Sequence, residues 1–70
     1  MPKLPSSDDI VHALIRKGFV FVSQNGSHAK FRSLRKPIRT VIVPVPRKQI
    51  PLGTFRSILR QSGLHEDDVM

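Results

Sequence analysis

The segment Asn25-Gly26-Ser27-His28 is the first place where the types and spacing of residues suggest chemistry. Asn-Gly is the strongest short-range signal for a β-hairpin, so we expect a strand before it and another after it. A histidine beside a tight turn is positioned by the backbone yet reaches solvent. Because side chains alternate along a strand, Lys30 and Arg32 are expected on the same face as His28. This strand therefore presents an imidazole beside two cations.

An imidazole among cations suits the cleavage of RNA. RNA carries its own nucleophile, the 2′-OH, so cleavage needs a group that takes its proton, cations that stabilise charge on the phosphate, and a proton for the leaving oxygen. His28 is the candidate catalytic residue, acting as a general acid/base. A nucleic-acid contact and a hydrogen bond within the hairpin are its alternative roles, and no second general acid or base is evident nearby.

The remaining residues exclude several other kinds of site. His12 and His65 are expected on the surface, and the spacing of the three histidines matches no zinc-ligand pattern, so neither a metal nor a cofactor is expected. No acidic residue lies between Asp9 and Glu66. Paired-carboxylate hydrolases, two-metal nucleases and Ser-His-Asp triads therefore each lack a part, and a metal-independent mechanism is the consistent choice.

The charge of the chain indicates a polyanionic partner. Twelve Lys and Arg residues against five acids give a net charge of +7, and seven of the twelve bases are Arg. All five acids lie near the ends of the chain. The positive field of such a chain usually attracts nucleic acid, although an acidic protein would be attracted as well. The residues expected to bind RNA are Ser27, Lys30, Arg32, Arg35, Lys36, Arg56 and Arg60.

Local signals predict one domain over residues 1–70, with helices at both ends. A capping box of Ser6 and Asp9 precedes an apolar stripe of Ile10, Val11, Leu14 and Ile15, which predicts a helix from about Asp8 to Lys17. A second helix is expected from about Gly53 to Ser62, starting at Gly53 or Thr54. Gly63 should end it in the left-handed conformation, and the acidic tail should add one further turn.

Strands are expected at Phe19–Val22, His28–Arg32 and Arg39–Val43. The order α-β-β-β-α predicts an α+β fold, a three-stranded antiparallel sheet with both helices on one face, which is the arrangement of double-stranded RNA-binding domains. No apolar run approaches the ~20 residues of a membrane span, and the N-terminus has no apolar signal region, so a cytoplasmic protein is expected.

The chain resembles the HicA toxins of bacterial and archaeal toxin-antitoxin pairs. The likeness rests on Lys17-Gly18-Phe19, on Gln24-Asn25-Gly26-Ser27-His28, on Val43-Pro44-Val45-Pro46, and on the run from Gly53 to Leu64. The resemblance implies an mRNA interferase, an endoribonuclease with His28 as its catalytic histidine, which arrests translation and growth. It also implies a HicB-type antitoxin that binds this chain and covers His28, and we expect a monomer when the toxin is free.

Two alternatives stay open at this point. The chain could be a non-catalytic RNA-binding module that recognises A-form shape and phosphates. It could also be a protein-interaction module whose basic face fits an acidic partner.

Overall fold

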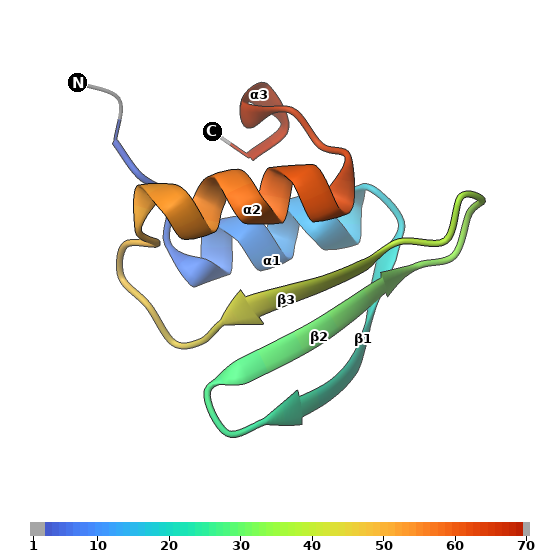
Figure 1. Ribbon diagram of the computed structural model, residues 1–70, viewed down its shortest axis with the longest axis horizontal. Helices are drawn as coiled ribbons and strands as arrows, with labels where there is room; N and C mark the ends of the chain where they lie inside the picture. The colour runs from blue at the N-terminus through green and yellow to red at the C-terminus, as the bar shows by residue number, and fades with distance from the viewer. Residues whose placement is uncertain (1–2, 70) are drawn as a thin grey trace.

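A computed structural model describes residues 3–69 and shows a small sheet covered by helices on one face (Figure 1). The predicted α+β fold with the order α-β-β-β-α is confirmed, with one short helix added at the C-terminus. The elements are α1 (Ser7–Arg16), β1 (Phe19–Asn25), β2 (His28–Ser33), β3 (Thr40–Pro44), α2 (Leu52–Ser62) and α3 (Glu66–Val69). None of the helices within residues 3–69 has the length and hydrophobicity that a membrane crossing requires.

Helix α1 begins at the predicted capping box. The Ser6 hydroxyl accepts a hydrogen bond from the Asp9 N–H, and the Asp9 carboxylate accepts one from the Ser6 N–H. Ile10 and Leu14 are fully buried, but the prediction that Ile15 belongs to the apolar stripe is wrong, because its side chain is 55% exposed. At 100° per residue, Ile15 is rotated away from the stripe that faces the sheet.

The sheet has the strand order β1-β2-β3 and is antiparallel throughout. Asn25 pairs with His28, so the hairpin loop consists of Gly26 and Ser27 instead of the predicted Asn25-Gly26. Gly26 has a φ of +61° and Ser27 has a negative φ. A glycine at the first loop position is typical of a type II′ turn, which fits the twist of the two strands. Strand β1 is also three residues longer than predicted, with an irregularity between Phe21 and Ser23.

The core lies between the sheet and the first two helices. Its members are Ile10, Leu14, Phe19, Ala29, Phe31, Val41, Val43, Ile50, Phe55 and Ile58. The alternation of β2 supplies Ala29 and Phe31 to this core. Burying these side chains is the main stabilising contribution, since the chain has no cysteine and therefore no disulfide.

Helix α2 lies beside β3 and ends as predicted. Gly63 adopts the left-handed conformation with a φ of +74°, and its N–H donates to the Leu59 carbonyl. Its start differs from the prediction, because Pro51 is the N-cap and Leu52 is the first helical residue. Proline fixes its own φ near the helical value and supplies no side-chain acceptor, so this helix start lacks the polar cap by which a start is recognised in a sequence.

Candidate active site

His28 is the first residue of β2, and its side chain points away from the core. The predicted alternation is confirmed, because His28 and Arg32 are exposed while Ala29 and Phe31 are 3% exposed. The register places Pro44 of β3 beside His28. The imidazole therefore stands on the sheet face opposite the core, at the hairpin end of the strand.

The backbone around His28 is held on both sides. The Val45 N–H donates to the carbonyl of Ser27 at 2.8 Å, which ties the hairpin loop to the end of β3. The Gln24 side-chain amide donates to the Gly26 carbonyl at 3.1 Å. These bonds hold the turn that positions the histidine.

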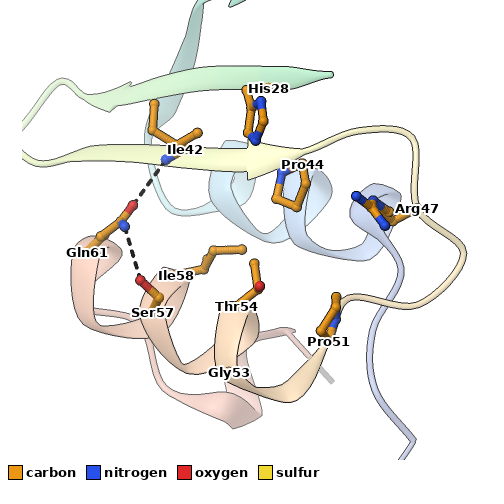
Figure 2. A pocket seen from close by; sticks show the side chains of 10 residues that line it. All are labelled: His28, Ile42, Pro44, Arg47, Pro51, Gly53, Thr54, Ser57, Ile58 and Gln61. Atoms are coloured by element: carbon orange, nitrogen blue, oxygen red, sulfur yellow. Dashed lines mark hydrogen bonds between the residues drawn. The ribbon is translucent and has the colours of Figure 1, made fainter. Parts of the chain in front are cut away.

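His28 borders a cleft of about 420 Å³ between the sheet and α2 (Figure 2). The cleft is lined by His28, Ile42, Pro44, Arg47, Pro51, Gly53, Thr54, Ser57, Ile58 and Gln61. In Figure 2 the helix passes beside the edge of β3, and Ile42 and Pro44 lie between the imidazole and the helix. The site thus combines an imidazole, a guanidinium and hydroxyl groups around one opening.

Gln61 connects the helix side of the cleft to the strand side. Its side-chain Oε1 accepts a hydrogen bond from the Ile42 N–H at 3.1 Å, and its Nε2 donates to the Ser57 hydroxyl at 3.3 Å (Figure 2). Behind them Ile58 is 1% exposed and belongs to the core. The separation of the two walls is therefore set by core packing and by one direct hydrogen bond, between Ile42 and Gln61.

The cleft has a positive electrostatic character. Arg47 lies on the loop between β3 and α2, and none of the five acids lines the cleft. The first turn of α2 contains no acidic residue, so the positive end of the helix dipole is not neutralised there. Within residues 3–69, the only ion pair joins Lys17 to Asp68 at 3.3 Å, outside the cleft. This potential favours an anionic ligand.

The structure brings some of the predicted RNA-binding residues to His28 and separates others from it. Ser27 precedes it in the turn, and Lys30 lines an adjoining hollow together with His28. Arg32 continues the same exposed row along β2. In the loop after β2, Arg35 and Lys36 lie beyond its other end, roughly 20 Å from His28 at about 3.3 Å per residue.

Arg56 and Arg60 lie outside the cleft. Arg56 lines a different groove, together with Leu4 and Phe55, and Arg60 is exposed one turn later on the same helix. The two arginines share a face of α2, as predicted, but Thr54, Ser57 and Gln61 form the face that borders the histidine.

Sequence reasoning missed four polar residues of the cleft: Arg47, Thr54, Ser57 and Gln61. The spacing of the last three, at i, i+3 and i+7, places them on one side of a helix and was a usable signal. Arg47 carried no such signal, because its position depends on how the loop packs.

No group of three or more metal-ligating side chains comes together in the part of the chain that the structure describes. The arrangement around His28 is an exposed imidazole beside a cleft that Arg47 lines and no acid lines. A solvent-accessible imidazole can exchange a proton with a ligand in the cleft, and the guanidinium can stabilise negative charge there.

Comparison with known proteins identifies a family whose sequence model matches this chain. The family model described as the HicA toxin of bacterial toxin-antitoxin matches residues 7–64 of the 70-residue chain. The matched segment runs from the start of α1 through the whole sheet and α2. No curated protein matches the chain.

Proposed function

We propose that this chain, which belongs to the HicA toxin family of bacterial toxin-antitoxin systems, is an endoribonuclease that cleaves mRNA with His28 as its general acid/base. The observation that carries the proposal is the position of His28, exposed at the border of a cleft that also contains Arg47 and that no acid lines. Family membership supports the role of a toxin. The geometry supports the chemistry.

The proposed reaction uses the ribose of the substrate. His28 takes the proton from the 2′-OH, whose oxygen attacks the adjacent phosphorus. The bond between phosphorus and the 5′ oxygen then breaks, and that oxygen needs a proton, which the imidazolium formed in the first transfer carries. The products are a 2′,3′-cyclic phosphate and a 5′-OH. Cations beside the histidine stabilise the charge that develops on the phosphate.

The same residues support a mechanism without a metal ion. Phosphoryl-transfer sites that use divalent cations hold them with carboxylates, and the five acids of this chain all lie near its ends. None of them lines the cleft. The 2′-OH provides the nucleophile that a metal-bound water provides elsewhere.

We further propose RNA and a HicB-type antitoxin as the two partners. The exposed row of His28, Lys30 and Arg32 offers phosphate contacts to RNA, and an antitoxin that covers this row would block both binding and cleavage. Cleavage of mRNA in the cytoplasm would stop translation and growth.

A non-catalytic RNA-binding module remains the second candidate, because the fold has the element order of double-stranded RNA-binding domains and β2 carries Lys30 and Arg32 on the sheet face opposite the core. The two candidates differ in their products. Under the nuclease proposal, RNA incubated with the protein yields fragments that end in 2′,3′-cyclic phosphate and 5′-OH. Under the binding-module alternative, RNA is retarded on a native gel but keeps its length.

A mutagenesis test uses two histidines as a matched pair. His28→Ala should abolish cleavage and growth arrest while RNA binding is largely retained. His12→Ala is the control, because His12 is exposed on α1 and does not line the cleft. Retention of cleavage by His28→Ala, with the same product ends, would contradict the proposed role.

A further inference from the structure

Arg47 has a backbone that is held firmly by the beginning of α1. The Arg47 N–H donates to the Ser7 hydroxyl at 3.0 Å, and the Ser7 N–H donates to the Arg47 carbonyl at 2.9 Å. The Ser7 hydroxyl also lies 3.3 Å from the same carbonyl. Ser7 is only 3% exposed, so these bonds are shielded from competing water.

The loop around Arg47 is held at a second point. The Ile50 N–H donates to the carbonyl of Pro5 at 2.7 Å, and the Ile50 side chain is fully buried in the core. The loop between β3 and α2 is therefore attached on both sides of Lys48, to Ser7 at the start of α1 and to Pro5 just before it. Little backbone entropy therefore remains to be lost there when a ligand binds.

The guanidinium of Arg47 has no partner within residues 3–69. Arg47 is exposed, and none of the hydrogen bonds or ion pairs in this part of the chain involves its side chain. Asp8 borders a second hollow beside Arg47 but forms no ion pair with it. An arginine with a fixed backbone and an unpaired planar fork is suited to binding an oxyanion bidentately.

We propose that Arg47 binds a phosphate of the RNA backbone in the cleft, beside the imidazole of His28. The inference rests on the proposed function for its ligand, RNA, but it concerns binding and is tested by binding. Arg47 borders the same opening as His28, whereas Arg35, Lys36, Arg56 and Arg60 do not. Arg47 is thus the arginine that lines the cleft itself, where it can contact a phosphate while the histidine faces the adjacent ribose.

The test measures the affinity of a single-stranded RNA oligonucleotide in a His28→Ala background, in which the RNA stays intact. Adding Arg47→Ala should weaken binding by about tenfold or more, the loss expected for a charge-assisted hydrogen bond. The slope of log affinity against log salt should fall by about 0.7, the value for one lost phosphate contact on a single strand. Arg47→Lys should keep the salt slope but lose part of the affinity, because it keeps the charge without the fork.

Lys48→Ala is the matched control, since it removes the same charge from the neighbouring exposed residue, which does not line the cleft. It should change the affinity less than about twofold. Equal effects of Arg47→Ala and Lys48→Ala would overturn the proposal, because they would show a general charge effect. Thermal unfolding of each variant separates loss of contact from loss of fold.

The outcomes for Arg47 and for catalysis are distinguishable. If wild-type protein does not cut RNA but Arg47→Ala still weakens binding selectively, the phosphate contact stands and the nuclease proposal fails. If wild-type protein cuts RNA and Arg47→Ala binds as tightly as its parent, the Arg47 proposal alone fails. Absence of RNA binding by the His28→Ala protein itself would overturn the Arg47 proposal.

Discussion

The carbonyl of Ser27, the residue before His28, accepts a hydrogen bond from the N–H of Val45 at 2.8 Å. This bond joins the hairpin loop that positions the histidine to the end of the strand that leads into the Arg47 loop. His28 and Arg47, which both line the cleft, therefore come from segments that are attached to each other through the backbone. The relative position of the two backbone segments is therefore set by hydrogen bonds within the fold.

Alanine should have opposite effects on stability at two glycines, Gly26 in the hairpin turn and Gly53 in the first turn of α2. Gly26→Ala should destabilise the protein by roughly 1–2 kcal/mol, because residue 26 has a φ of +61° that alanine adopts only at that cost. Gly53→Ala should instead raise stability, by up to about 1 kcal/mol, since Gly53 is helical and no atom lies within 4 Å of an added Cβ. Urea unfolding measures both, and equal effects would contradict the role assigned to the turn.

Loss of the Gln61 side chain should loosen the helix wall of the cleft. Gln61→Ala leaves the Ile42 N–H without its protein partner and should cost about 1 kcal/mol of unfolding free energy. Arg60→Ala, at the neighbouring exposed position, should change stability by less than about 0.5 kcal/mol. If the two variants were equally stable, the hydrogen bond between α2 and β3 would not contribute measurably.

The stability of the protein should decrease in acid through Asp68. Its pKa lies below the ordinary value of 3.8, first because its carboxylate accepts the His65 N–H and then because of Lys17. A carboxyl whose pKa is lowered in the folded state stabilises the fold fully above its unfolded pKa, and this contribution is lost as the pH falls through the folded value. The melting temperature of Asp68→Asn should therefore lie below that of wild type near neutral pH and approach it below pH ~3.8. A constant difference across this range would contradict the assignment, and Asp67→Asn, outside these bonds, is the control.

A double-mutant cycle should show that Ser7 acts on RNA binding through Arg47. Ser7→Ala removes the acceptor of the Arg47 N–H, so it should weaken RNA binding when Arg47 is present and have no further effect in Arg47→Ala. The affinity of RNA for the four proteins, each in the His28→Ala background, measures this coupling. Additive effects would limit Ser7 to a structural role.

The sequence predicted those parts of the fold that depend on near neighbours. The capping box of Ser6 and Asp9, the alternation along β2 and the left-handed Gly63 are each decided within a few residues, and all three are confirmed. The predicted hairpin loop, Asn25-Gly26, was wrong by one residue, because Asn-Gly and Gly-Ser both form acceptable two-residue turns. The pairing of β1 with β2 decides between them.

The candidate site could be predicted only in part. His28 and its exposed face followed from the hairpin and the period of the strand. The opposite wall did not, because it depends on α2 passing the edge of β3, where Gln61 meets Ile42. The place of Arg47 in the cleft could not be predicted either, since its contact with Ser7 joins residues that are 40 positions apart in the sequence.

The most direct test of the central claim is incubation of purified wild-type and His28→Ala protein with a long RNA in EDTA, followed on a denaturing gel. We expect wild-type protein to fragment the RNA and His28→Ala to leave it intact. Equal fragmentation by both proteins, or none by either while both bind the RNA, would contradict the claim that His28 makes this protein a metal-independent ribonuclease.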